Sequence, residues 1–156
     1  MSETKFKYRR LGHNFNEVIA LLDEIQLTTP RESVGSLFRP LSRICDHCTF
    51  GILSSMDGYP VLKSKFYRLT IGRIAFHTFM IMKRMKHNTS LPIPGEHLAN
   101  SESLELAVTR MRQAIDRFRS WNAPLKPHFA YGRLSKSQYE LIHCLHLEDH
   151  LRSITL

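Results

Sequence analysis

Two histidines near the end of the chain have a spacing suited to binding a metal ion. His146 and His150 are four residues apart, so on a helix both imidazoles project from one face. Much earlier, His47 lies at the edge of an apolar arc, and Gly51 leaves space one turn later. One histidine from one helix and an i,i+4 pair from another form a three-nitrogen site that leaves positions for water or substrate. The sequence therefore predicts a divalent metal site made of His47, His146 and His150.

Other polar residues beside these histidines could assist them. His143 falls on the same helical face as the pair, where it would either support a ligand or simply pack. Asp46, Glu148 and Asp149 could orient an imidazole or accept a proton, although acids at such positions more commonly lie on the helix surface. We therefore expect surface positions for these acids and assign no catalytic residue.

The cysteines allow a competing interpretation. Cys45 and Cys48 form a C-x-x-C pair that could complete a Cys₂His₂ zinc site with the C-terminal histidines. Zinc cysteines usually lie on turns, whereas this pair falls in the middle of a predicted helix, with Cys48 near the apolar arc and Cys45 away from it. An odd set of three cysteines fits reduced thiols, and Cys48 and Cys144 are better interpreted as small buried hydrophobic residues.

The elements that must position these residues are helices. Apolar residues recur three and four positions apart, and Ser135 to Gln138 have the pattern of a capping box before the last helix. Two stretches rich in proline and glycine, 87–100 and 121–134, have no period and are predicted to be surface loops. No segment alternates as a strand would. Helices are expected over about residues 14–28, 40–56, 63–86 with a break near Gly72, 101–121, and from 135 onward. The predicted fold is all-α, an antiparallel four-helix bundle with long loops, in a single domain spanning residues 1–156.

The amino-acid composition limits the kinds of molecule that this protein could have as partners. The 156 residues, 42% hydrophobic and 23% charged, are typical of a globular domain. The first ten residues lack the apolar core of a signal peptide, and the most apolar stretch, 74–82, is too short to span a bilayer, so we expect a cytoplasmic protein without membrane contact. The net charge is +8, but the basic residues are spread widely without a stacking or groove-entering motif, which argues against a nucleic-acid partner. Motifs for serine nucleophiles and phosphate loops are absent from the sequence.

Four segments carry a resemblance to a known superfamily: 44–47 (ICDH), 57–60 (DGYP), 128–134 (HFAYGRL) and 143–151 (HCLHLEDHL). In order and spacing they resemble a bacterial family of unknown function within the DinB-like superfamily, over about residues 8–152. The resemblance implies a four-helix bundle whose metal, often nickel or zinc, is held by His47, His146 and His150. The chain departs from the pattern at Asp149, where a second histidine is usual, and in the run from His128 to Gly132, where H-P-x-F-G is usual.

The resemblance also suggests a function. Characterised DinB-like proteins include thiol S-transferases, so it implies a metal-dependent transferase or hydrolase acting on a small molecule, such as a low-molecular-weight thiol, and a homodimer. A bound Zn²⁺ or Ni²⁺ lowers the pKa of water or of a ligated thiol and so makes a nucleophile near neutral pH. A non-catalytic metal-binding or interaction module of the same fold is the alternative, and the sequence leaves open whether the protein is an enzyme.

Overall fold

The computed structural model describes residues 11–28, 38–97 and 103–154, and all regular elements in these ranges are helices. The nearest approach to sheet there is an isolated antiparallel bridge between His128 and Gly132. This confirms the all-α prediction. None of the helices in the described ranges is both long and apolar enough to cross a membrane. The helices are α1 (Phe15–Thr28), α2 (Phe38–Asp57), α3 (Lys65–Leu69), α4 (Ile71–Met82), α5 (Leu104–Ser120) and α6 (Lys136–Ile154).

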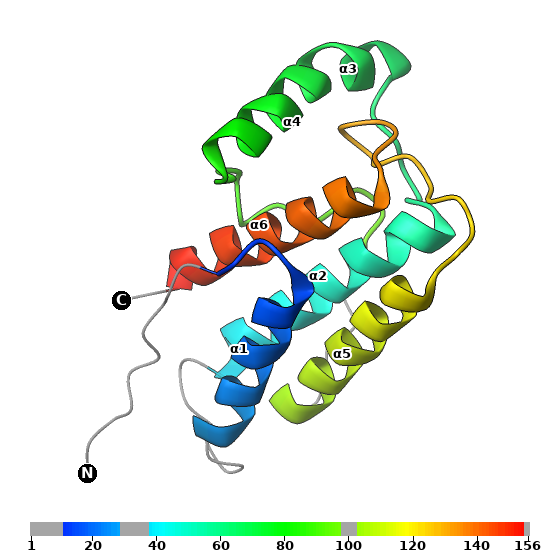
Figure 1. The fold of residues 1–156 in the computed structure, drawn as a ribbon. Coiled ribbons are helices and arrows are strands. Elements are labelled where there is room, and N and C mark those ends of the chain that lie inside the picture. Colours follow the sequence, from blue (N-terminus) through cyan, green and yellow to red (C-terminus); the bar gives the residue numbers. More distant parts are fainter. Residues whose placement is uncertain (1–10, 29–37, 98–102, 155–156) are drawn as a thin grey trace.

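Four of the helices, α1, α2, α5 and α6, form the bundle. α2 packs against both α5 and α6, while α1 packs against α5 and α6 from the other side (Figure 1). α2 is also covered by the loop that carries Ile93 and Glu96. Nearly all its side chains between residues 41 and 56 are therefore buried or half-buried. A helix surrounded in this way cannot have a single apolar stripe facing one polar face.

The outer helices follow the sequence pattern more closely. Asn14 Oδ1 accepts the backbone N–H groups of Asn16 and Glu17 at 3.0 and 3.3 Å, which caps the first turn of α1. α5 begins after Ser103, whose Oγ accepts the N–H of Leu106 at 3.1 Å. The apolar residues of α5 that recur three and four positions apart are all buried: Leu104, Val108, Met111, Ile115 and Phe118. In α1 the apolar residues at this spacing are buried at Val18, Leu22 and Ile25, and partly buried at Ile19.

The last helix begins with the predicted capping box. Gln138 N–H donates to Ser135 Oγ at 3.2 Å, and Ser135 N–H donates to Gln138 Oε1 at 2.9 Å. The two residues thus satisfy each other's backbone donors, which fixes where α6 starts. From this start the register of α6 places His143, His146 and His150 toward the interior of the molecule.

The segment predicted as one broken helix over 63–86 forms an arm outside the bundle, made of α3 and α4 (Figure 1). The break falls at Thr70, two residues before the expected position near Gly72, and Lys83 ends α4 in the left-handed conformation. Gly72 instead lies directly against the carbonyl of Ala130, where a Cβ would clash. The apolar residues of the arm are mostly exposed, namely Phe66, Leu69, Ile71, Ile74, Ile81 and Met82, while Phe76 is fully buried.

Candidate metal centre

The structure brings together the three histidines that the sequence singles out. His47 comes from the middle of α2, and His146 and His150 come from successive turns of α6. One ring nitrogen from each lies within 4.8 Å of the others. His146 Nε2 is 3.2 Å from His47 Nε2 and 3.1 Å from His150 Nε2. Three imidazole nitrogens converging in this way form a donor set of the type that binds Zn²⁺ or Ni²⁺ in proteins.

Burial keeps the two histidines of α6 unprotonated, so their lone pairs are available to a metal ion. The pKa of His146 is lowered well below its ordinary value, first by burial and then by the neighbouring His47 and His150. Burial is also the main cause that lowers the pKa of His150 to about 3, followed by His47 and His87. Both imidazoles are therefore neutral at physiological pH, which is the form that coordinates a metal ion.

Glu96 orients His47, and sequence reasoning did not identify it. Its Oε2 lies 2.7 Å from His47 Nδ1, and its side chain is only 1% exposed. The same oxygen accepts the backbone N–H of Ile93 at 2.9 Å. A carboxylate on Nδ1 holds the proton at that nitrogen and leaves the Nε2 lone pair for a ligand. The expectation that residues 87–100 form a surface loop is therefore wrong for Ile93 and Glu96, which are inserted beside the site.

A fourth histidine, His87, also lies at the cluster, and it too was missed. Its Nε2 is 3.3 Å from His150 Nε2, and its ring centroid is 4.8 Å from that of His146. Asp149 Oδ2 accepts the backbone N–H of His87 at 2.9 Å and lies 2.7 Å from its Nδ1, although the ring N–H is not aligned on the oxygen. Burial is the main cause that lowers the pKa of His87, against the opposing effect of Asp149.

The three acids expected on helix surfaces are buried, so that interpretation is wrong. Asp46 is 6% exposed and lies 4.0 Å from an Arg110 nitrogen. Glu148 and Asp149 are both bound by Arg152, at 3.2 and 3.0 Å. They are buried because α2 and α6 are covered on more than one side. Of the three, Asp149 contacts a histidine of the cluster, and it does so at the position where the chain departs from the DinB-like pattern.

The cysteines are not part of the histidine cluster. Cys45, Cys48 and Cys144 are free and buried, and no cysteine belongs to the metal-ligand cluster found within residues 11–28, 38–97 and 103–154. Burial, and then Asp46, raises the pKa of Cys45 to about 12, so it is protonated near neutral pH and a poor metal ligand. The expectation that Cys45 faces away from the apolar side is wrong, because this residue is only 2% exposed.

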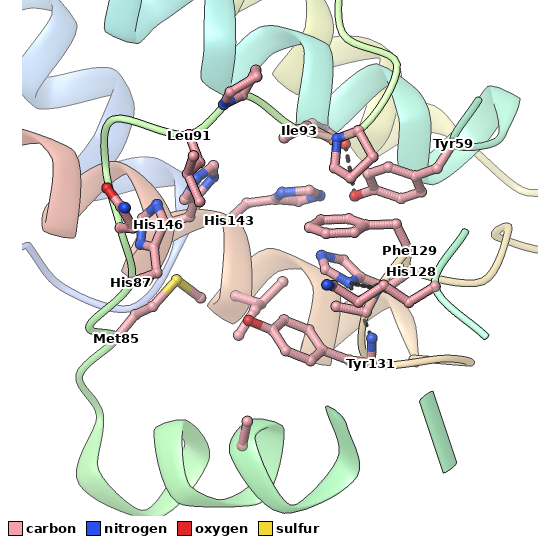
Figure 2. Close-up of a pocket in the computed structure, with 18 of the residues that line it drawn as sticks. Tyr59, Met85, His87, Leu91, Ile93, His128, Phe129, Tyr131, His143 and His146 are labelled. Carbon is pink, nitrogen blue, oxygen red and sulfur yellow. Dashed lines mark hydrogen bonds between the residues drawn. The ribbon is translucent and has the colours of Figure 1, made fainter. Parts of the chain in front are cut away.

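A cavity of about 410 Å³ opens directly beside the histidines. In Figure 2, His87 and His146 lie at one end and Tyr59 and Tyr131 at the other, with His143 between them. The wall is mostly aromatic and aliphatic, with contributions from α2, α4, α6 and the loops before α5 and α6. The rest of the lining includes Phe79, Met85, Leu91, Ile93, His128 and Phe129. A cavity of this size beside a metal-ligand cluster is typical of a small-molecule site.

Two further histidines line this cavity in different ways. His143 packs against Phe15, Phe118 and Tyr139, and burial lowers its pKa to about 3. Its Nε2 is buried without a hydrogen-bond partner in the described part of the chain. His128 Nδ1 accepts the backbone N–H groups of Ala130 and Tyr131 at 3.1 and 3.3 Å, so the proton of the neutral ring sits on Nε2 and His128 can donate to a ligand.

The fold and the cluster define an all-helical protein with a histidine-rich site at one end of an apolar cavity. The chain belongs to the family described as protein of unknown function (DUF1569), whose model matches residues 2–156. No curated protein and no solved structure matches it.

Proposed function

We propose that this protein binds one divalent metal ion through His47, His146 and His150, and that it is a metal-dependent enzyme acting on a small molecule. The observation that carries the proposal is the convergence of three ring nitrogens within 4.8 Å at the end of a cavity large enough for a substrate. The DinB-like relationship suggested by the sequence motifs agrees with this ligand set and stays a prediction.

The chain's own residues supply orientation and exclusion of water. Glu96 fixes the ring of His47, and the burial of the α6 histidines keeps them neutral. A bound Zn²⁺ or Ni²⁺ supplies a Lewis acid that lowers the pKa of a coordinated water or thiol. The apolar wall limits water around the reacting group, and the Nε2–H of His128 offers a hydrogen bond to a polar atom of the substrate.

The reaction class remains a transferase or a hydrolase. A low-molecular-weight thiol is the substrate that the resemblance suggests, and a homodimer is its expected assembly; both stay predictions, as does the absence of a nucleic-acid partner. The alternative, a non-catalytic metal-binding module, differs in one measurable respect. An enzyme must admit a substrate atom to the metal, at an open position, as an additional ligand or by displacing a protein ligand, whereas a structural site keeps its protein ligands and admits none.

The first experiment is the metal content of protein purified without a chelator or a histidine tag. We expect about one zinc or nickel ion per chain, and far less in the His146→Ala/His150→Ala variant, since this variant lacks the whole i,i+4 pair of ligands. The Cys45→Ser/Cys48→Ser variant is the control and should retain its metal. Protein that takes up neither metal at micromolar concentration would refute the proposed function. Metal loss in the cysteine variant as well as in the histidine variant would favour the Cys₂His₂ site.

A further inference from the structure

His87 flanks the two histidines of α6 at ring distances similar to those of His47. The ring centroids of His146 and His150 lie 4.9 and 4.6 Å from that of His47, and 4.8 and 4.9 Å from that of His87. The α6 pair is therefore flanked by one imidazole from α2 and one from the loop after α4. Each flanking ring also has a buried carboxylate at its Nδ1, Glu96 for His47 and Asp149 for His87.

The four Nε2 atoms approach one another closely. They form a chain of contacts in the order 47, 146, 150 and 87, at 3.2, 3.1 and 3.3 Å. Glu96 holds the Nδ1 proton of His47, so His47 Nε2 presents a lone pair to the cluster. Nδ1 of His87 makes no hydrogen bond in the described part of the chain, although Asp149 lies 2.7 Å away. The ring of His87 is therefore not fixed by Asp149 in an orientation that would prevent it from turning toward a metal ion.

Four nitrogens at 2.0–2.1 Å from a tetrahedral ion lie about 3.3–3.4 Å from one another, and three pairs of these Nε2 atoms already lie at 3.1–3.3 Å. His87 lies outside the group of three histidines whose nitrogens are all within 4.8 Å of one another, so coordination requires its ring to move toward the ion. We propose that His87 is a fourth nitrogen ligand of the metal ion, which makes the complete site a four-histidine site. This inference rests on the metal-binding function proposed above and adds a ligand from a third element of the chain.

Hydrogen bonds hold the loop that carries His87 beside the site, near both of its ends. At its start, the backbone N–H of His87 donates to Asp149, and Arg152 donates to the carbonyl of Met85 at 3.4 Å. Near its other end, Glu96 accepts from Ile93 while it holds His47. His87 is thus placed by residues that themselves belong to the cluster or adjoin it, rather than by an unrelated surface contact.

A fourth imidazole changes what the site can do. With three histidines, a tetrahedral ion keeps one position for water or substrate, and His87 fills that position. A substrate thiol or water must then bind as a fifth ligand or displace His87. The loop that carries His87 also lines the cavity through Leu91 and Ile93. Displacement of His87 from the metal ion would therefore also rearrange the cavity wall.

The test uses Co²⁺ as the probe, added to metal-free, untagged, full-length protein and followed by visible absorption. The Co²⁺ bands report the number and type of ligands, a readout independent of enzyme activity. We compare wild type with His87→Ala, His87→Gln and His47→Ala. His77→Ala removes an exposed histidine of α4 and serves as the matched control. Circular dichroism identifies any variant that has lost its helices, and His87→Gln preserves most of the volume if the alanine variant does not fold.

We expect both His87 variants to bind Co²⁺ at least about tenfold more weakly, because loss of an outer-shell partner alone already costs that much. Their bands should shift, and added imidazole should restore the wild-type spectrum of His87→Ala. The His77 variant should match wild type. Wild-type affinity and spectrum in the His87 variants, together with loss of binding in His47→Ala, would overturn the fourth ligand and leave the three-histidine site intact. Failure of the wild-type protein to bind Co²⁺ would overturn both proposals.

Discussion

At the scale of single residues, the sequence predicted the clustered histidines that lie on helices and missed the residues beside them that lie on a loop. The i,i+4 spacing of His146 and His150 places them on one face wherever the helix lies, so their proximity follows from local structure alone. His87 and Glu96 stand 63 and 49 residues from the histidines they contact. Nothing periodic marks them, because an irregular loop reaches its contacts only through the tertiary fold.

The predictions that failed at this scale share one physical cause. Cys45, Asp46, Glu148 and Asp149 were expected toward the outside because each helix was assumed to bury one stripe. α2 and α6 are instead covered on more than one side, and all four side chains are buried. Where a helix lies inside a bundle, its own pattern cannot say which polar residues will be buried or that they will pair with arginines such as Arg110 or Arg152.

The carboxylate of Glu96 should tune the metal affinity of the site. Glu96→Gln keeps the shape and an acceptor oxygen but removes the charge that holds the Nδ1 proton of His47. We expect Zn²⁺ affinity to fall about 10- to 100-fold with no change in fold, the usual effect of losing such a partner. Competition with a chromophoric zinc chelator measures this. Glu105→Gln, at an exposed position of α5, is the control, and equal affinities for the two variants would contradict the role of Glu96.

At the scale of elements, the helices and their caps were predictable, but the placement of the α3–α4 arm was not. Caps are local, so Asn14 and the Ser135 box mark the starts of α1 and α6 directly from sequence. The arm carries apolar residues at helical spacing, yet Ile74, Ile81 and Met82 are exposed. The periodicity of apolar residues indicates that a helix forms. The side of that helix that becomes buried depends on the loop over residues 128–134, which lies beneath it.

Two glycines in helices should respond in opposite ways to alanine. At Gly72 a Cβ would overlap the Ala130 carbonyl, so Gly72→Ala should destabilise the protein by roughly 1–3 kcal/mol, the usual cost of overpacking. At Gly51 the nearest atom to a Cβ is Ile93 Cδ1 at 3.4 Å, an ordinary contact. Gly51→Ala should therefore be neutral or stabilise by up to about 1 kcal/mol, because alanine favours helix. Urea unfolding of both variants checks the signs, and a loss at Gly51 equal to that at Gly72 would refute the argument.

At the scale of the whole molecule, the cavity beside the histidine cluster is lined by residues of both the bundle and the arm. Two further histidines of this cavity, His128 and His143, are buried, and their burial affects the stability of the fold. Burial lowers the pKa of His128 well below its ordinary value, with His143 adding to the effect, and lowers the pKa of His143 to about 3. A histidine that is neutral when folded and protonated when unfolded makes stability depend on pH. Below the ordinary pKa of about 6.5 the unfolded chain binds protons that the folded chain excludes.

The metal-free protein should therefore lose stability as the pH falls through 6.5 toward 5. The free energy of unfolding should drop by roughly 2 kcal/mol between pH 7 and pH 5 for His143 alone, with His128 adding a loss of the same sign. His143→Phe should make this dependence shallower, because phenylalanine can pack among Phe15, Phe118 and Tyr139 without binding a proton.

His77→Phe, which replaces an exposed histidine, controls for the loss of any histidine. Urea unfolding in the presence of a chelator at pH 7, 6 and 5 measures the slopes. If His143→Phe keeps the wild-type slope, His143 does not exclude protons in the folded state. If stability instead rises as the pH falls, then buried histidines do not dominate the acid response of this molecule.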